Sequence, residues 1–600
     1  MTASRPESWR KSTQPLAPLT HEPTRPGKYD PYPFFPLGAG RIQVGFDALA
    51  RVIAGRSRVL IDGYVGVLWE PFREELDRSL RRLGIQAQWV CTEDALLNEA
   101  RIERIVGPFL GGDDPLFGKR FEGALSDFFD RSRLRAMLTE GHGGLTIVYG
   151  CGAALVEEQA LVVYVDLPKN ELQFRARAGA IRNLGVSHSQ APKVMYKRFY
   201  FVDWPALNRH KADCLHRFNL IVDGQRPREP VMMSGEDFRG ALQRMSRGCF
   251  RARPWFEPGP WGGQWIKQHL SRVSPEPPNY AWSFELIAPE NGIVLEGDGR
   301  LLEVSFDWLM FAEHEAVLGE CADVFGADFP IRFDFLDTFD GGNLSVQCHP
   351  RLGYIREHFG ETITQDETYY ILDCAPGAEV YLGFREGIDA ASFRDVLESS
   401  HTDAHEVDIR RYVQTHPARK HDLFLIPHGT IHCSGRNNMV LEISATPYIF
   451  TFKMYDWLRL DLDGQPRPLN IQRAFENLNF KCQGDVVCRE LIRQPRIIER
   501  GEGWSLTHLP THRDHFYDVH RYEFVHEVAG DTRGSCHVMS LVEGRSILLE
   551  TADGMRRRFN YAETFIVPAA AERYRLINEG PAPVKVIKAF IKEDLSMLRC

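Results

Sequence analysis

One short stretch, residues 343–350, constrains this chain more than any other. Its apolar residues alternate with Ser345, Gln347 and His349, and period-two alternation bounded by Gly and Pro predicts a β-strand. Because side chains alternate across a strand, Gln347 and His349 point to the same face. A strand with a glutamine and a histidine on one face needs polar partners from elsewhere in the chain.

Two later segments supply such partners. Glu367 lies in a strand-like run, and His432 follows a Pro-His-Gly turn at the start of another. Together the side chains offer nitrogen and oxygen donors, the ligand types of an open zinc site that keeps a position for water or substrate. The predicted ligands of one zinc ion per chain are Gln347, His349, Glu367 and His432.

Six short motifs then occur in a fixed order, and one motif alone would carry little weight. They are residues 261–263 (WGG), 282–285 (WSFE), 329–337 with 344–350 (FPIRFDFLD, LSVQCHP), 427–432 (PHGTIH), 440–443 (VLEI) and 453–459 (KMYDWLR). In type and order they resemble type I mannose-6-phosphate isomerases, which are zinc cupins. The resemblance covers about residues 253–480, with a weaker tail to 600.

The resemblance implies a fold, a ligand set and a reaction. The family's metal ligands, a Gln, His, Glu, His set, fall on the four residues named above. The implied reaction is aldose–ketose isomerisation between mannose 6-phosphate and fructose 6-phosphate, or of a related sugar. The implied partner is therefore a small sugar or sugar phosphate. Such chemistry needs a Lewis acid, a base within reach and a cation near the developing enediolate.

The chain departs from the family at two positions near the substrate. Gln365 stands where the family has a lysine, and Lys453 stands where it has an arginine. The first change removes a charge, and the second loses a planar fork that can bind two oxygens at once. We expect Gln365 and Lys453 to bind substrate, with Lys453 as the main cation and a candidate acid or base.

Three carboxylates complete the predicted site. Glu442 and Asp456 are candidates for proton transfer or for supporting the ligands. Glu285, in the motif 282–285, is a candidate substrate-binding residue. Each of these residues is also open to a purely structural interpretation.

The sequence predicts a multi-domain protein, an α/β region followed by all-β cupin domains of the double-stranded β-helix or jelly-roll type. The expected parts are an N-terminal arm (1–40), an α/β domain (41–248), a metal-binding cupin (253–480) with a helical insert (about 390–421), and a second cupin (490–600). The histidines of the last part do not repeat the ligand pattern, so a metal-free second barrel is expected.

The α/β domain begins with a strand, a Gly-rich turn and a helix, the layout of a phosphate-binding loop. In this order of elements it faintly resembles the uridine kinase and phosphoribulokinase group of P-loop proteins. A working loop reads GxxxxGK[ST], but residues 63–69 (GYVGVLW) have no Lys and no hydroxyl at those places. Trp69 would also block a phosphate. We expect an inactive domain used for packing or assembly.

Composition excludes several classes of partner. The net charge of −9 gives no basic surface for nucleic acid or an anionic membrane. No apolar run reaches the length of a transmembrane helix, and the polar N-terminus has no signal-peptide core. The 12 scattered cysteines fit reduced thiols. The expected location is the cytoplasm, and the oligomeric state stays open.

Three functions remain open at this point. The first is a metal-dependent sugar isomerase. The second is a cupin that binds a sugar without turning it over, which the changes at Gln365 and Lys453 keep open. The third is a bifunctional sugar kinase–isomerase, which the missing loop lysine disfavours.

Overall fold

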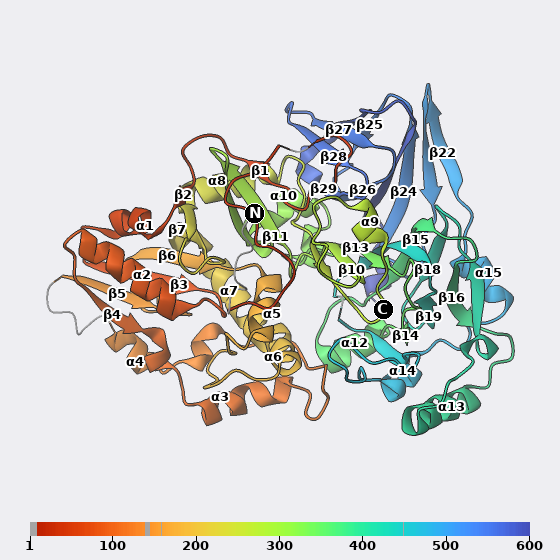
Figure 1. Ribbon diagram of the computed structural model, residues 1–600, viewed down its shortest axis with the longest axis horizontal. Coiled ribbons are helices and arrows are strands. Elements are labelled where there is room, and N and C mark those ends of the chain that lie inside the picture. Colours follow the sequence, from red (N-terminus) through yellow and green to blue (C-terminus); the bar gives the residue numbers. More distant parts are fainter. Residues whose placement is uncertain (1–8, 24, 138–143, 158, 448, 600) are drawn as a thin grey trace. The chain divides into compact units, whose positions relative to one another are not determined.

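The computed structural model describes residues 9–23, 25–137, 144–157, 159–447 and 449–599 (Figure 1). Residues 1–8 of the expected N-terminal arm therefore lie outside the described residues. The chain divides into two compact units, which we call unit 1 and unit 2. Unit 1 comprises Met1–Glu22, Phe34–Met245 and Pro289–Glu313, and unit 2 comprises Pro23–Pro33, Ser246–Ala288 and His314–Cys600.

Unit 1 is built on a 7-stranded sheet whose inner strands are parallel. The apolar runs predicted as strands are all present, because continuous Val, Ile and Leu suit strands buried on both faces. Two antiparallel strands extend one edge. The order is β2 (Gln43–Val44), β8 (Val231–Ser234), β7 (Phe218–Asp223), β6 (Leu161–Asp166), β3 (Arg58–Gly63), β5 (Leu145–Tyr149), β4 (Ala87–Cys91).

Helices connect these strands, as the alternating pattern predicts (Figure 1). One expected helix, residues 171–184, is shorter in the structure and ends at Arg177, because Gly179 adopts a positive φ that stops it. The helices are α1 (Phe46–Ile53), α2 (Trp69–Arg82), α3 (Glu99–Val106), α4 (Arg131–Ala136), α5 (Lys169–Arg177), α6 (Pro192–Arg198), α7 (Trp204–Cys214) and α8 (Gly235–Met245).

Unit 1 also contains a hairpin that comes later in the chain than the α/β region. Strands β11 (Gly292–Gly297) and β12 (Arg300–Ser305) pair with each other, and the short β1 (Phe35–Pro36) adds to β11. The helix α10 (Asp307–Leu318) follows and has a non-helical backbone at Glu313, where unit 1 ends. The sequence analysis places this hairpin in the cupin region, and the structure groups it with the α/β sheet.

The carboxyl ends of the parallel strands are the ligand-binding edge of open α/β sheets. In unit 1 three buried aspartates, Asp62, Asp166 and Asp223, lie there. Asp62 accepts one hydrogen bond from the backbone N–H group of Gly152 (2.8 Å) and one from the His210 ring (2.7 Å). Burial lowers the pKa of His210, but Asp62 outweighs it and raises the pKa to about 10, so this pair is ionic.

The other two aspartates are satisfied by unit 1 itself. Lys211 donates to Asp166 (2.9 Å), and the Ser305 backbone N–H donates to the same carboxylate (2.7 Å). Asp223 accepts from the backbone N–H of Glu303 (3.0 Å). Strand β12 thus covers the edge where an α/β domain of this kind would hold a ligand.

The turn after β3, where a P-loop would bind phosphate, is filled by a side chain. The ring of Trp69 lies against Gly63, so that a β-carbon built on Gly63 would be only 2.9 Å from the ring. This placement supports the expectation that Trp69 occupies phosphate space. The P-loop resemblance itself remains a prediction.

Unit 2 contains two pairs of antiparallel sheets, so the expected multi-domain architecture with several β-sheets is confirmed. The first pair holds the segments of the six motifs. Its 6-stranded sheet has the order β18 (Leu423–Ile426), β15 (Glu367–Cys374), β20 (Asn438–Ala445), β13 (Ile331–Asp337), β10 (Trp282–Leu286), β9 (Trp255–Glu257), and its 5-stranded sheet has the order β17 (Val413–Pro417), β16 (Glu379–Phe384), β19 (His432–Ser434), β14 (Val346–Cys348), β21 (Phe452–Tyr455).

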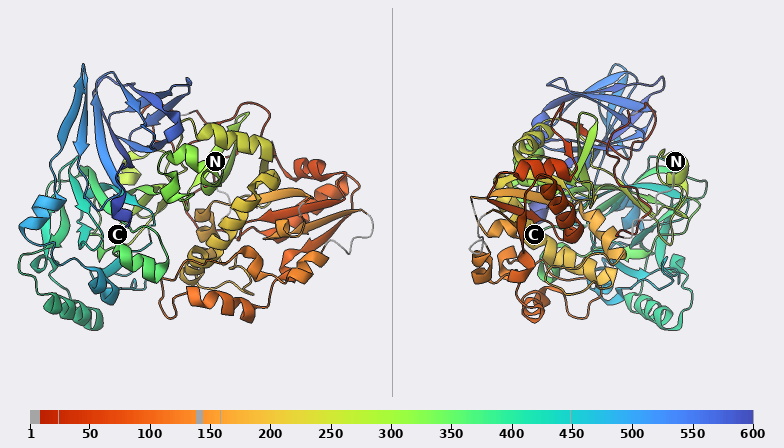
Figure 2. Two further views of the ribbon diagram at one scale, coloured as in Figure 1. Left: turned by 180° about the vertical axis from the view of Figure 1, so that it is seen from behind. Right: turned by 60° about the vertical axis from the view of Figure 1, so that its left-hand side comes forward.

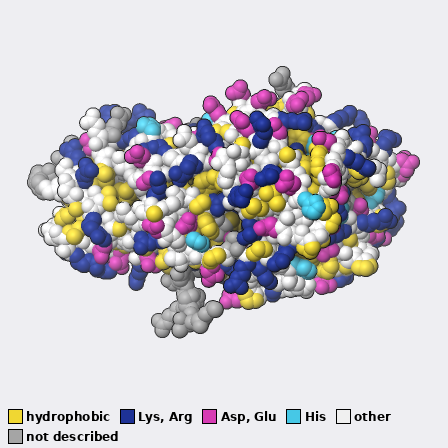
Figure 3. All heavy atoms as spheres, turned by 90° about the horizontal axis from the view of Figure 1, so that it is seen from above, with side chains coloured by type: hydrophobic (Ala, Val, Ile, Leu, Met, Phe, Trp, Pro, Cys, Tyr) yellow, Lys and Arg dark blue, Asp and Glu magenta, His cyan; other side chains and the backbone are white. Residues whose placement is uncertain are grey.

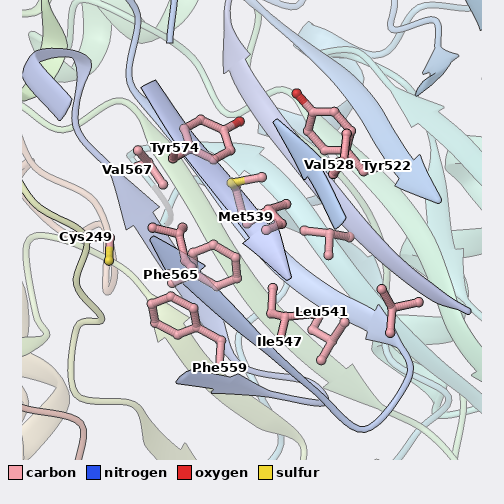
Figure 4. Packing of buried hydrophobic residues seen from close by; sticks show 14 of the residues in the cluster. Cys249, Tyr522, Val528, Met539, Leu541, Ile547, Phe559, Phe565, Val567 and Tyr574 are labelled. Carbon is pink, nitrogen blue, oxygen red and sulfur yellow. The ribbon is translucent and has the colours of Figure 1, made fainter. Parts of the chain in front are cut away.

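The second pair, blue in Figure 2, lies in the expected second barrel region. Figure 4 shows apolar side chains from both of its sheets, including Met539 and Ile547, meeting in one core. The 6-stranded sheet has the order β22 (Arg496–Gly501), β23 (Trp504–Leu509), β24 (Tyr517–Phe524), β31 (Val584–Ile591), β26 (His537–Glu543), β29 (Thr564–Val567), and the 4-stranded sheet has the order β25 (Glu527–Asp531), β30 (Arg573–Asn578), β27 (Ser546–Thr551), β28 (Arg556–Asn560).

The described part of unit 2 also contains helices, of which α13 (Ala390–Asp403) is the longest. The predicted helical insert contains α13, whose first turn is capped by the Asp389 side chain. The remaining helices are α9 (Trp265–His269), α11 (Ala322–Phe325), α12 (Leu352–Phe359), α14 (Ile471–Asn477) and α15 (Asp485–Leu491).

Three features concern the surface, the helices and the cysteines. On the face shown in Figure 3, basic and acidic side chains are intermingled. Among the described residues, no helix is long and apolar enough to cross a membrane. The cysteines that the structure describes are all free.

We predict that unit 1 neither binds ATP nor transfers phosphate. The turn 63–69 lacks the lysine and hydroxyl that hold phosphate and magnesium. The aspartates at the carboxyl ends of the parallel strands are also already hydrogen-bonded to other residues of unit 1. Calorimetry of the full chain with magnesium and ATP should show no binding. ATP binding together with a phosphorylated sugar product would contradict this prediction.

Candidate metal centre

The first sheet pair brings the four predicted ligands together. Gln347 on β14 is the direct cross-strand neighbour of His432 on β19, and neighbours of this kind project to the same face. His349 follows directly after β14, and Glu367 begins β15 in the facing sheet. The site is therefore assembled across the interior between two sheets.

Distances among the donor atoms are those of groups that can share one ion. Glu367 Oε1 lies 3.0 Å from His349 Nε2, and Glu367 Oε2 lies 3.3 Å from His432 Nε2. The Gln347 amide lies 3.4 Å from His432 Nε2. His349, Glu367 and His432 each offer a ligand atom within 4.8 Å of the others.

Both histidine rings are oriented by the backbone. His349 Nδ1 donates to the carbonyl of Phe450 (3.1 Å), and His432 Nδ1 donates to the carbonyl of Thr430 (2.9 Å). With Nδ1 as the donor, each Nε2 is left as an acceptor facing the centre. Metal-binding histidines usually have this arrangement, because the backbone contact fixes both tautomer and ring orientation.

Two buried atoms of the predicted ligands make no hydrogen bond within the described part of the chain. They are His349 Nε2 and Glu367 Oε2, and an unsatisfied buried acceptor is costly. Burial raises the pKa of Glu367, but His349 and His432 outweigh it and lower the pKa well below its usual value. An ionised carboxylate with two inward-facing imidazoles and an amide fits a divalent ion such as zinc.

Behind the predicted ligands lies a buried arginine, Arg332, that the sequence analysis did not single out as functional. Arg332 on β13 forms an ion pair with Glu442 and lies 3.5 Å from Glu367. The Arg332 Nε group donates to the Ser444 hydroxyl at 2.8 Å. Arg332 is only 4% exposed, so its positive charge is buried next to the predicted ligand Glu367.

Sequence alternation contained the signal for Arg332. In β13, the polar residues Arg332 and Asp334 alternate with the apolar residues Ile331, Phe333 and Phe335. Arg332 is opposite Ser444, and Ser444 is opposite Glu367. Polar residues that recur with period two inside an otherwise apolar strand share one face, and here that face carries the candidate metal centre.

Gln365 and Lys453 both lie beside the ligands. The Gln365 amide donates to Glu367 Oε1 at 2.6 Å, so it orients the carboxylate. Lys453 on β21 is the cross-strand neighbour of Gln347 and is half-buried. Its side chain therefore emerges on the same face as the ligand amide.

The remaining predicted site residues have other partners. Asp456 is bound by Arg467 (2.6 Å) and Arg459 (2.7 Å). Burial raises the pKa of Asp456, but these arginines lower it below the usual value, which favours a positioning role over proton transfer.

Glu285 is part of a different buried network of unit 2. Its carboxylate accepts a hydrogen bond from Tyr29, pairs with Arg251 (3.3 Å) and accepts from the Ser283 hydroxyl (2.8 Å). Arg251 also pairs with Glu563 (2.9 Å). These contacts join the arm segment 23–33 to both sheet pairs, and none of them involves a predicted metal ligand.

Comparisons with known proteins give a match to one family and matches to several curated relatives. Residues 45–247 match a family described as a domain of unknown function, DUF8485. A mannose-6-phosphate isomerase from Streptococcus mutans is 29% identical over 221 residues, which are 37% of this chain and 64% of that protein. The probable mannose-6-phosphate isomerase GmuF of Bacillus subtilis is 24% identical over 319 residues, 53% of this chain and 92% of that protein.

A solved structure gives a similar extent of likeness. The mannose 6-phosphate isomerase from Bacillus subtilis covers 57% of this chain and 99% of its own, with 20% identity and a TM-score of 0.47. The chain spans 64% of the length of the Streptococcus relative. The curated relatives confirm the resemblance to mannose-6-phosphate isomerases over part of the chain.

We predict that replacing His349 and His432 together by alanine removes about one zinc ion per chain, because two of the four donors are lost. Elemental analysis of the purified protein measures this. His401 and His405 are exposed, and the double alanine variant at these positions is the matched control that should keep its zinc. Full retention of metal by the first variant would refute the ligand assignment.

We also predict that Arg332→Leu lowers the free energy of unfolding by about 3–5 kcal/mol, since it leaves buried carboxylates without their cation. Thermal unfolding monitored by near-ultraviolet circular dichroism measures the loss. The exposed Arg496, replaced by leucine, is the control and should change stability little. Equal effects of the two substitutions would rule out a special role for Arg332.

Proposed function

We propose that unit 2 carries a metal-dependent aldose–ketose isomerase acting on mannose 6-phosphate and fructose 6-phosphate or a related sugar. The observation that carries this proposal is the inward-facing donor set of Gln347, His349, Glu367 and His432, in which His349 Nε2 is buried without a hydrogen bond. The relation to mannose-6-phosphate isomerases over part of the chain supports it.

The residues present fit a zinc ion held by those four side chains. When bound, zinc would supply a Lewis acid that polarises the carbonyl and hydroxyl oxygens of the sugar. A neutral glutamine keeps the ligand charge low. Gln365 and Arg332 hold Glu367 in place through its carboxylate.

Lys453 is proposed as the cation that faces the substrate. Its position beside Gln347, half-buried and on the same face, supports a role for this positive charge next to an enediolate or a phosphate of the substrate. Preorganised charge of this kind stabilises the negative charge that develops during the reaction. Gln365 cannot do this because its amide is neutral and already bonded to Glu367.

Proton transfer between adjacent carbons needs a group that can accept and return a proton. Glu442 lies in the same interior as the ligands and is held by Arg332 and Ser444. Lys453 and Glu442 are therefore the proposed pair for this step. Asp456, held by two arginines, is proposed to position the segment that follows β21.

A second candidate is a cupin that binds a sugar without turning it over. The observation that favours this candidate is the hydrogen bond from Gln365 to Glu367. At this position the family has a lysine, and the neutral amide of Gln365 supplies no positive charge. Incubation of the zinc-loaded protein with free and phosphorylated hexoses distinguishes the two. Ketose formation identifies the isomerase, and binding without ketose formation identifies the binding protein.

We predict that Lys453→Met lowers the isomerisation rate by about 100-fold or more while zinc content stays unchanged, because an electrostatic donor is lost without a ligand. Lys453→Arg should retain or raise activity on mannose 6-phosphate. The exposed Lys481, replaced by methionine, is the control. Normal turnover by Lys453→Met would show that the side chain is a bystander.

A further inference from the structure

The C-terminal sheet pair carries a second cluster of donor side chains. His508 lies on β23, and its direct cross-strand neighbour on β24 is His520. Asp518 lies two residues before His520 on the same strand. Cross-strand neighbours and residues two apart share a face, so all three side chains project to one side of the sheet.

That side faces the interior of the sheet pair. The next cross-strand pair on the same face of these two strands, Leu506 and Tyr522, belongs to the apolar core of this part of unit 2, and Figure 4 shows Tyr522 among the core side chains. The cluster continues this row beyond the core. His508 and Asp518 have side chains 21% and 19% exposed, so the cluster is half-buried and accessible to an ion.

The carboxylate in this cluster is held in a fixed orientation. Asp518 Oδ1 accepts from the Thr511 hydroxyl (3.1 Å) and from the backbone N–H of Val519 (2.9 Å). Asp518 Oδ2 is directed to His508 Nε2 at 2.8 Å. One oxygen thus anchors the group, and the other faces the histidine.

The third member has an unused donor atom. His520 Nδ1 is buried and makes no hydrogen bond within the described residues. The His520 ring is packed edge-on against Phe590, with centroids 4.8 Å apart, and against His508, with centroids 5.1 Å apart. Packing fixes this ring, so its unsatisfied nitrogen is not free to turn to solvent.

We propose that His508, Asp518 and His520 form a second divalent-metal site, with a preference for zinc-type ions. Each residue offers one ligand atom within 4.8 Å of the others. Two imidazoles and one carboxylate are nitrogen and oxygen donors of intermediate hardness, which suit zinc and its neighbours in the first transition series. Three protein ligands leave a position for water or a small ligand.

A nearby cation does not occupy the site. Lys588 is the neighbour of His520 on β31, but its ammonium lies over the rings of Tyr522 and Phe590 at 5.1 Å and 5.2 Å from their centroids. It also donates to the Tyr522 hydroxyl at 3.4 Å. These contacts hold the Lys588 ammonium against the aromatic rings of the core.

The second site is independent of the proposed isomerase. It shares no residue with the first centre, and its residues lie on strands of another sheet pair. It also differs from the expectation of a metal-free second barrel. That expectation rested on the absence of the first centre's ligand pattern, and the second site uses a different pattern. The ligands come from two adjacent strands of one sheet instead of two facing sheets.

Zinc titration of the full-length protein tests the proposal. In the background His349→Ala with His432→Ala, calorimetry with zinc chloride should show one remaining ion per chain. Adding His508→Ala and His520→Ala should abolish it, whereas adding His526→Ala, an exposed histidine two residues beyond β24, should not. Cobalt substitution should give visible absorption bands that follow the same pattern.

A milder variant covers the case in which the alanine substitutions unfold the sheet. Asp518→Asn keeps the shape of the side chain and should weaken zinc binding about 10-fold or more, with an unchanged circular dichroism spectrum. Absence of zinc binding in the first background, or equal zinc affinity of Asp518→Asn and its parent, would overturn the assignment. Both results are read without isomerase activity, so failure of the proposed function leaves this test intact.

Discussion

The contact of Glu367 with two histidines across the interior is the constraint on which the first sheet pair depends. Facing β-sheets normally meet through apolar side chains, and here a carboxylate on β15 meets imidazoles from the opposite sheet. Burying that charge is costly unless it is fully paired. Arg332, Gln365 and the two backbone carbonyls that orient the rings can all be understood as meeting this one requirement.

The second sheet pair shows the alternative solution. Its interior is centred on an apolar cluster in which Met539, Leu541 and Phe565 are fully buried, and His508 and His520 lie at the end of one row of this interior. Two pairs of antiparallel sheets in one unit thus fill the same kind of space in opposite ways. The first sheet pair buries a polar centre between its two sheets. The second sheet pair has an apolar core, and its cluster of His508, Asp518 and His520 is partly exposed to solvent.

Much of this arrangement could be predicted from the sequence. Alternation placed Gln347 and His349 on one face, and motif order tied them to Glu367 and His432. The period-two pattern of β13 places Arg332 on the polar face of an apolar strand, but its role as the partner of Glu442 and Glu367 depends on long-range contacts that the pattern does not reveal. The hairpin 292–305 was misplaced for a similar reason, since membership of a sheet depends on long-range partners that periodicity does not reveal.

The placement of that hairpin has a consequence for how the protein is made. Unit 1 takes its last segment from Pro289–Glu313, after the chain has already contributed Ser246–Ala288 to unit 2. That last segment supplies the backbone donors of Ser305 to Asp166 and of Glu303 to Asp223, in addition to partners from earlier in unit 1 such as Lys211. Neither unit is a continuous length of polypeptide, so the first cannot be completed on the ribosome before the second has begun, and no single cut in the gene yields either unit whole.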